Sequence, residues 1–433
     1  MRRLSAGLLS IVLIWGLISS APAATAEPDW FAPPSASEIA AAPPGKVFKT
    51  RTLPYRLAGL PLPLRTVQLM FRTTDQQGRP TAGVTSVVQP LLSVGTGKAV
   101  SYQSFYDSLS PADQPSRVIA GNQRFPGGSI VNVETLVIAP LLLQGFTVII
   151  PDTQGQTADF AAGREYGAVT LDSVRASLAS VQTGLGASTK VGMIGYSGGA
   201  IATGWAAQLQ PNYAPELSKN LVGAAEGGVL VAPAHNLRYV EGSQIWAGVA
   251  PMAIAGVARA FDIDFTPYLN DRGRTVLENI KDDSIVEVLG AYPGLKFADL
   301  VKPAFANPLS IPEFVTAANA LNMGSAPSPK IPMFIGQGAN GALEGTPAGP
   351  AGIGNGDGVM IAGDVRSLAR QFCGDGTTVQ YRQYDALSHF TTVALWLPEA
   401  LAWLQTRFTP VPAPNNCASI APGNSLAPEV LAR

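Results

Sequence analysis

The stretch Gly195-Tyr196-Ser197-Gly198-Gly199 constrains the fold of this chain more than any other part of its sequence. It follows KVGMI, an apolar run typical of a buried strand, and it opens GGAIATGWAAQLQ, a helix that we expect Pro211 to end. A sharp turn from strand to helix strains its central residue, and the flanking glycines remove side chains that would collide there. The pattern predicts that Ser197 is a nucleophile, with the Gly198 amide and the helix N-terminus placed to stabilise an oxyanion.

The segments on either side of this turn predict a sheet. Residues 47–88 alternate apolar and polar side chains between turns, as antiparallel strands do. The later runs KAVSYQS, FTVIIPD, KIPMFIGQG and TTVQYRQY are short and are separated by segments long enough for helices. One of these segments, residues 167–185, has apolar residues at helical spacing, the last of which is Val181. The sequence predicts an α/β fold with a mostly parallel central sheet flanked by helices.

One long segment between these strands has a different character. Residues 235–328 show no strand period but include helix-like stretches such as RTVLENIKDDSIVEVLGAY. A structureless loop of this length is uncommon in a compact domain. We therefore expect residues 235–328 to be a helical cap inserted into a core of residues 27–234 and 329–417, followed by a frayed tail of residues 418–433.

The N-terminus has the order of a secretory signal peptide. Arg2 and Arg3 precede the apolar run AGLLSIVLIWGLISS and the small residues APAATA. This predicts that residues 1–26 are removed and that the protein is secreted. No later stretch is long and apolar enough to span a bilayer, so no transmembrane segment is expected after signal removal. The formal net charge of −1 and the lack of a basic patch argue against a nucleic-acid partner.

Cysteine usage is informative because the sequence has only two cysteines, Cys373 and Cys417. An even count in an exported chain predicts one disulfide, for which the loop-closure model gives about 4 kcal/mol. Two buried free thiols are the alternative. A pair of cysteines is too few for a metal cluster, so no metal site is expected.

A nucleophilic serine needs a base, and the sequence offers two histidines, His235 and His389. Where the nucleophile sits on a strand-turn-helix motif, the acid follows it along the chain, and the histidine comes after the last strand. His389 follows TTVQYRQY and precedes the final amphipathic helix, which is that place. His235 lies at the entry to the cap and is interpreted as a structural or pocket-edge residue.

Four aspartates between KIPMFIGQG and His389 compete for the role of the acid that orients the base. We favour Asp357, which lies in the glycine-rich loop GIGNGDGV after a strand, although it could instead cap the following helix. Asp364 is expected on the exposed face of that helix and Asp375 in the turn beyond it. Asp385 shares the loop of His389, which is not the usual place for the acid.

The second oxyanion donor is expected in the loop FYDS, which follows the strand AVSYQS. Spacing alone identifies this loop and not the residue, because Asp107 could equally be a turn or cap residue.

Several stretches resemble the secretory lipases typified by fungal lipase A and its actinobacterial relatives. They are SYQSFYDS, VIIPDTQGQTADFAAGREYGAVTLDSVRA, GYSGGA, LVGAAEGGV, GDGVM and SHF, and they extend over nearly all of residues 46–417. The resemblance implies an α/β-hydrolase fold with a helical lid, a C-terminal disulfide and hydrolysis of triacylglycerols or other esters. It also implies that Ser197, Asp357 and His389 form the triad and that Asp107 and Gly198 form the oxyanion hole. The stretch GALEGTPAGPAGIGNG, residues 341–356, is longer than the resemblance leads us to expect.

These observations predict a serine hydrolase that forms an acyl-enzyme and needs no metal or organic cofactor. The expected partners are a lipid or small ester and a lipid–water interface. The same triad also serves peptidases and acyltransferases, because the motif does not choose the leaving group. An exported binding module with a vestigial triad is an alternative from another class.

Overall fold

The computed structural model describes residues 29–91 and 97–432, so the predicted signal peptide lies outside the described residues. The chain divides into a short N-terminal unit, residues 1–33, and a main unit, residues 34–433. The sheet and every site discussed below lie within the main unit.

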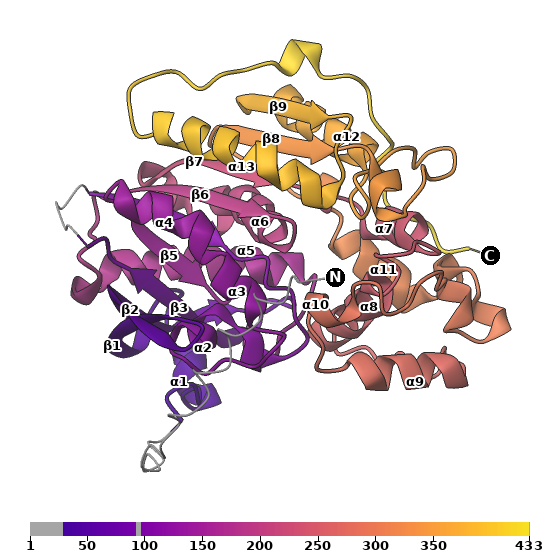
Figure 1. The fold of residues 1–433 in the computed structure, drawn as a ribbon, viewed down its shortest axis with the longest axis horizontal. Coiled ribbons are helices and arrows are strands. Elements are labelled where there is room, and N and C mark those ends of the chain that lie inside the picture. Colours follow the sequence, from indigo (N-terminus) through magenta and orange to yellow (C-terminus); the bar gives the residue numbers. More distant parts are fainter. Residues whose placement is uncertain (1–28, 92–96, 433) are drawn as a thin grey trace, which may run out of the picture. The chain divides into compact units, whose positions relative to one another are not determined.

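Nine strands of the described chain form one sheet in the order β1-β2-β3-β5-β4-β6-β7-β8-β9 (Figure 1). The neighbours from β1 to β5 in this order pair antiparallel, and all pairs from β5 to β9 are parallel. The strands are β1 (Val47–Leu57), β2 (Leu60–Thr74), β3 (Pro80–Val88), β4 (Lys98–Gln103), β5 (Thr147–Pro151), β6 (Lys190–Tyr196), β7 (Leu221–Gly227), β8 (Met333–Gly338) and β9 (Val379–Tyr384). The predicted antiparallel opening and parallel centre are both present.

Helices cover both faces of the sheet because its central strands are apolar on both sides. On β6, for example, Met193 packs into the cluster that holds α5 (Gly163–Ala179), α6 (Gly198–Tyr213) and α12 (Ala362–Gly374). Its neighbour Ile194 packs on the opposite face, against α4 (Thr135–Leu143) and α13 (His389–Thr406). Three shorter helices are α1 (Ala36–Ala41), α2 (Pro115–Ile119) and α3 (Ser129–Val133). In the part of the chain that the structure describes, no helix is both long and apolar enough to cross a membrane.

Two predicted helix ends were wrong. The helix predicted within residues 167–185 ends at Ala179, and Val181 lies beyond it with 86% of its surface exposed. The helix after the turn does not stop at Pro211 but continues to Tyr213, and the Ala214 amide still bonds to the Gln210 carbonyl. A proline in the last turn removes only one helical hydrogen bond, so it does not end the helix there.

The chain between β7 and β8 forms helices, turns and isolated bridges. Its helices are α7 (Pro233–Val240), α8 (Val249–Ala260), α9 (Asp271–Ile280), α10 (Ile285–Val288) and α11 (Pro312–Ala320). In Figure 1 they lie together beside the ends of the strands from which the loops of the site emerge. This segment contains the residues predicted as the cap, and residues 235–328 are called the cap below.

The cap is attached to the loop after β4 by backbone and side-chain hydrogen bonds. Ser108 and Ser284 form an isolated antiparallel bridge, and the Leu109 amide donates to the Asp283 carbonyl over 2.9 Å. Arg259 on α8 donates to the Leu109 carbonyl over 3.0 Å. The cap therefore bonds directly to the loop that the sequence predicts to hold an oxyanion donor.

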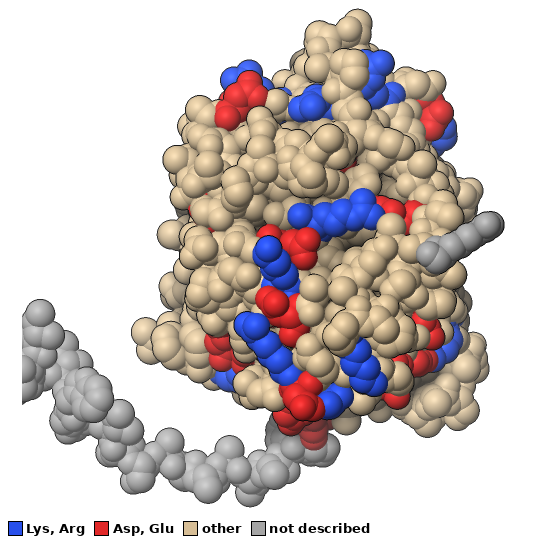
Figure 2. Space-filling view, turned by 90° about the vertical axis from the view of Figure 1, so that its right-hand side faces the viewer, with Lys and Arg blue, Asp and Glu red and all other residues tan. Residues whose placement is uncertain are grey.

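Charged side chains alternate in sign on the face shown in Figure 2. Ion pairs of the cap include Arg274 with Asp271, and Lys281 with Glu278 at 2.5 Å. Exposed pairs of this kind contribute about 0 to 1 kcal/mol each. On the face in Figure 2, the interspersed signs leave no large block of one charge.

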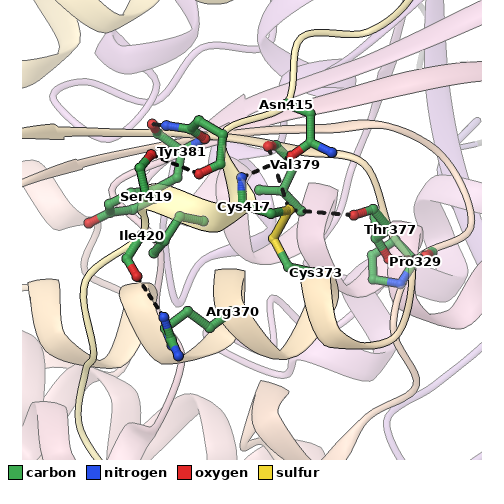
Figure 3. Close-up of a disulfide and its surroundings, with 11 residues drawn as sticks. Pro329, Arg370, Cys373, Thr377, Val379, Tyr381, Asn415, Cys417, Ser419 and Ile420 are labelled. Atoms are coloured by element: carbon green, nitrogen blue, oxygen red, sulfur yellow. Dashed lines mark hydrogen bonds between the residues drawn. A yellow bond between two sulfur atoms is a disulfide. The ribbon is translucent and has the colours of Figure 1, made fainter.

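The predicted disulfide is present and joins Cys373 near the end of α12 to Cys417 (Figure 3). The sulfur atoms are 2.05 Å apart and the Cα atoms 5.7 Å apart, as in an ordinary disulfide. One turn earlier on α12, Arg370 donates to the Ile420 carbonyl over 2.7 Å. The disulfide and this hydrogen bond fasten the start of the C-terminal tail to α12.

The expectation of a frayed tail was wrong. Ile420 is 4% exposed, and Asn424 donates to the Asp364 carboxylate over 2.7 Å. Farther along, the Glu429 amide donates to the side chain of Asn319 on α11 over 2.7 Å. The tail remains ordered because it gains specific partners first on α12 and then on the cap.

Candidate active site

Ser197 lies in the strained turn that the sequence predicts between β6 and α6. Its φ of 54° and ψ of −120° are rare for a residue with a side chain, and its amide donates to the Gly227 carbonyl over 2.8 Å. A Cβ at Gly195 would collide with the Gly199 carbonyl. Glycine is therefore required where the strand turns into the helix. Ser197 is partly exposed and lines a cavity, so a ligand can reach it.

Asp357 and His389 are brought together from two loops at the same edge of the sheet. Asp357 follows β8 and is fully buried, and His389 begins α13 after β9 and is 3% exposed. His389 Nδ1 lies 2.8 Å from Asp357 Oδ2, and the His389 amide donates to the Asp357 carbonyl over 2.7 Å. Because a carboxylate accepts hydrogen bonds, this contact places the ring proton on Nδ1 and leaves Nε2 as the basic nitrogen.

The Asp357 carboxylate is held rigidly by further donors. Oδ1 accepts from the amides of Val359 at 3.1 Å and Met360 at 2.8 Å, and Oδ2 also accepts from Gln337 Nε2 at 2.8 Å. The helix α12 that follows has Ile361 as its N-cap, so the alternative reading of Asp357 as that cap is wrong. These bonds orient the carboxylate toward His389.

His389 is also fixed relative to the strained turn. The hydroxyl of Tyr196, the residue before Ser197, donates to the His389 carbonyl over 2.6 Å, and the two rings are 5.0 Å apart. Burial lowers the pKa of His389, but the negative charges of Asp357, Glu344 and Asp107 outweigh it, so the pKa is raised overall. In the described chain, its Nε2 has no hydrogen-bond partner.

Asp107 lies in the loop after β4, directly against the start of α6. Its φ of 25° is unusual for a residue with a side chain, and a Cβ at Gly198 would collide with its carboxylate. The sequence-predicted oxyanion residues Asp107 and Gly198 are therefore neighbours, and both line the same cavity as Ser197. Burial, followed by the charge of Glu134, raises the pKa of Asp107 to about 7.

Sequence reasoning did not identify Glu134, which holds this loop in place. Its carboxylate accepts from the Tyr102 hydroxyl at 2.9 Å, the Ser104 hydroxyl at 2.6 Å and the Phe105 amide at 2.8 Å. Burial raises the pKa of Glu134 to about 7. A signal was available, because Glu134 is the one charged residue in the apolar run SIVNVETLVIAPLLL.

An apolar cavity opens beside these residues. Its volume is about 130 Å³, which is many times the space that one water molecule needs. Ser197, Gly198 and Asp107 line it together with cap residues, among them Trp246, Ala253, Ile254, Phe265, Phe314 and Leu321. Asp107 and Glu313 are the charged residues among those that line it. The cavity suits an apolar chain attached to a group held at Ser197.

The remaining candidates lie away from this constellation. His235 Nδ1 is 3.0 Å from Asp364, which is 1% exposed, so the expectation that Asp364 lies on an exposed helix face was wrong. Asp375 accepts from the Ser328 hydroxyl at 2.6 Å, and Asp385 accepts from Gln383 at 2.5 Å. None of these bonds involves Ser197 or His389.

The sheet order, the strained serine turn and the inserted helices define an α/β-hydrolase. The family model of the secretory lipases matches residues 123–416. Lipase 1 of Candida albicans is 30% identical, over 95% of this chain and 87% of its own. A Mycobacterium tuberculosis protein named as a probable inactive lipase is also 30% identical, over 90% of this chain and 84% of its own. Candida antarctica lipase A in its closed state aligns with a TM-score of 0.77 and 26% identity, over 92% of this chain and 90% of that one.

The chain therefore belongs to the secretory lipase family, and it is a carboxylic ester hydrolase whose substrates are lipids or other esters. The resemblance seen in the sequence and the predicted fold class are both confirmed.

Proposed function

We propose that the protein is a secreted lipase that hydrolyses triacylglycerols with Ser197 as nucleophile, His389 as general base and Asp357 as its orienting acid. The observation that carries the proposal is the 2.8 Å contact between His389 and the fully buried Asp357, packed beside the strained turn of Ser197. A nucleophile, a base and an orienter in this relation are the requirements of acyl transfer.

The proposed reaction is a double displacement. Ser197 Oγ attacks the acyl carbonyl while His389 Nε2 takes its proton, and the amides of Asp107 and Gly198 donate to the oxyanion. Collapse of this intermediate breaks the ester C–O bond, and His389 protonates the leaving alcohol. Water then attacks the acyl-enzyme with His389 again as base, which releases the acid and restores Ser197. By analogy with other serine hydrolases, each oxyanion donor contributes roughly 3 kcal/mol.

The substrate class rests on the cavity. An apolar space that begins at Ser197 and is walled by cap residues fits an acyl chain better than a peptide, whose backbone needs polar partners. We infer that the cap of residues 235–328 acts as a lid over this space and that the enzyme works at a lipid–water interface. The predicted signal peptide, residues 1–26, and the family's secretory character support export.

The test is Ser197→Ala, assayed beside wild type on p-nitrophenyl esters and triacylglycerols of graded chain length and on a set of peptides. We expect ester turnover to fall by about 10⁴-fold or more, since the nucleophile is lost, while the folded state is retained. Wild-type turnover in a folded Ser197→Ala protein would refute the proposed nucleophile.

The panel also separates the alternatives. Esters with long acyl chains should be the better substrates of the wild type because they fill the cavity. Peptide cleavage without ester cleavage would favour a peptidase. No turnover of any substrate by wild type would favour a non-catalytic module, an outcome that the relative named as inactive makes worth measuring.

A further inference from the structure

The unexpectedly long segment of residues 341–356 places a buried carboxylate beside the site. A short 3₁₀ helix, Gly341–Glu344, is closed by Gly345 in the left-handed region with φ of 74°. A Cβ at Gly345 would also lie only 2.7 Å from Cβ of Gln244 in the cap. Glycine at this position thus lets the segment approach the cap closely, and it leaves Glu344 only 4% exposed.

Glu344 joins three parts of the molecule. Its Oε1 accepts from the amide of Phe390, the second residue of α13, over 2.8 Å. Its Oε2 accepts from the indole Nε1 of Trp246 in the cap over 2.7 Å. A carboxylate at this end of α13 also faces the positive end of the helix dipole. Glu344 is therefore bonded both to the helix that begins with His389 and to the cap.

Trp246 in turn contacts the imidazole. Its ring lies edge-on to the His389 ring at 5.1 Å and stacks on the Phe390 ring at 5.0 Å. Trp246 also lines the cavity. The bond to Glu344 thus holds the indole against one side of the His389 ring. The bond to Asp357 separately sets the orientation of the imidazole.

Three carboxylates and one phenol face His389 from three parts of the chain. Asp357 and Glu344 come from the chain between β8 and α12, Asp107 comes from the loop after β4, and Tyr196 comes from β6. Burial raises the pKa of Tyr196 far above its ordinary value, so it stays neutral at working pH. Glu344 is the one of these acids that has no part in the proposed triad or oxyanion hole.

We propose that Glu344 is a positioning residue for the reaction: it holds Trp246 and the first turn of α13 against His389, and its charge favours the imidazolium that forms when Ser197 is deprotonated. The inference rests on the proposed triad. In this proposal, the long segment of residues 341–356 links the cap to His389.

The test is Glu344→Gln, which keeps the side-chain shape but removes the charge and one of the two acceptors. Two readouts are needed, the pH profile of kcat/KM with a short p-nitrophenyl ester and an NMR titration of the His389 ring. We expect the acid limb of the profile and the pKa of His389 to fall together by about 0.5 to 1 unit, because a nearby negative charge is lost. The plateau kcat should fall by up to about tenfold, the equivalent of one pKa unit.

The matched control is Glu399→Gln on the same helix, whose carboxylate accepts from the Tyr384 hydroxyl over 2.9 Å. It should leave both readouts at their wild-type values. An unchanged His389 titration and acid limb in folded Glu344→Gln would overturn the inference. Ser197→Ala is assayed in the same series. If it is inactive while Glu344→Gln leaves the His389 titration unchanged, the inference about Glu344 fails and the proposed triad stands, so the two failures are distinguishable.

Glu344→Asp provides a second measurement should Glu344→Gln not fold. The shorter side chain keeps the charge but cannot reach Trp246 Nε1 and the Phe390 amide at once. We expect kcat to fall several-fold while the pKa of His389 stays within about 0.2 units of wild type, because the charge remains. Wild-type kcat in Glu344→Asp would overturn the positioning role.

Discussion

Two regions of this molecule contain a histidine bonded through Nδ1 to a buried aspartate. At the strand ends His389 meets Asp357 at 2.8 Å, and beneath the C-terminal tail His235 meets Asp364 at 3.0 Å. Both carboxylates are almost completely buried. By the length of the contact and the burial of the carboxylate alone, the two pairs are nearly alike.

They differ in the second nitrogen of each ring. His235 Nε2 lies 3.6 Å from Glu429 of the tail, so a second acid occupies that side. His389 Nε2 has no partner among the described residues, and the ring packs against Tyr196 next to the serine turn. The comparison teaches that a histidine–aspartate pair becomes a candidate base where the second ring nitrogen has no other acid beside it and the ring packs next to the turn of a candidate nucleophile.

The largest expected effect on kcat comes from replacing the aspartate of each pair with asparagine. Asp357→Asn should lower kcat by about 10³ to 10⁴-fold, because an amide favours the wrong tautomer and does not stabilise the imidazolium. Asp364→Asn should leave kcat within about twofold and cost roughly 1 to 2 kcal/mol of stability, since only a structural bond weakens. Steady-state kinetics and urea unfolding of both variants measure this. The reverse pattern would move the acid of the triad to Asp364.

A smaller effect is expected from His235→Gln, which removes a titrating group from the structural pair. The hydrogen bond to Asp364 raises the pKa of His235 in the folded protein. The stabilisation that protonated His235 gives the folded state is therefore fully present below the pKa of His235 in the unfolded chain, and it is lost as pH rises through the pKa of His235 in the folded protein. The variant should thus lose about 1 kcal/mol of unfolding free energy at pH 5.5 and less at pH 8.5. Urea unfolding at both pH values is the measurement. A loss of turnover would show that this pair also serves catalysis.

The smallest effect is expected from Glu429→Gln at the outer end of the structural pair. Glu429 contacts Arg238 at 3.0 Å and His235 at 3.6 Å, and it is partly open to solvent. The loss should stay below about 1 kcal/mol and shrink in high salt, because solvent and salt still screen a partly exposed ion pair. Thermal unfolding at low and high ionic strength checks this. A large, salt-independent loss would mean that the tail depends on a desolvated charge.

The parts of the candidate site that follow from local pattern could be located in the sequence. Ser197 is marked by glycines at fixed offsets between a strand and a helix, and His389 by its place after the last strand. Asp357 could be preferred over its rivals because it alone occupies the loop after the preceding strand. The two cysteines left one pairing to test, and the structure contains it.

The contacts that span the chain were not predictable. Asp364 was expected on the exposed face of its helix, but His235 and the tail residue Asn424 bond to it from distant parts of the sequence. Glu134 and Glu344 act through partners that are far away along the chain, and no spacing rule connects them. Periodicity shows which face of a helix is apolar, but it does not show which loop will cover its polar face.

The insertion of the cap between β7 and β8 has a consequence for folding kinetics. These neighbouring strands pair in parallel, with Gly227 opposite Gly336, only after a loop of roughly a hundred residues has closed between them. Compared with an ordinary crossover of about 30 residues, the added loop-closure entropy is only about 1 kcal/mol, so the native sheet tolerates the insertion. The rate is affected more, because contacts between sequence-distant segments form late. The β8–β9 end of the sheet, which carries Asp357 and His389, should therefore dock after the strands that precede the cap.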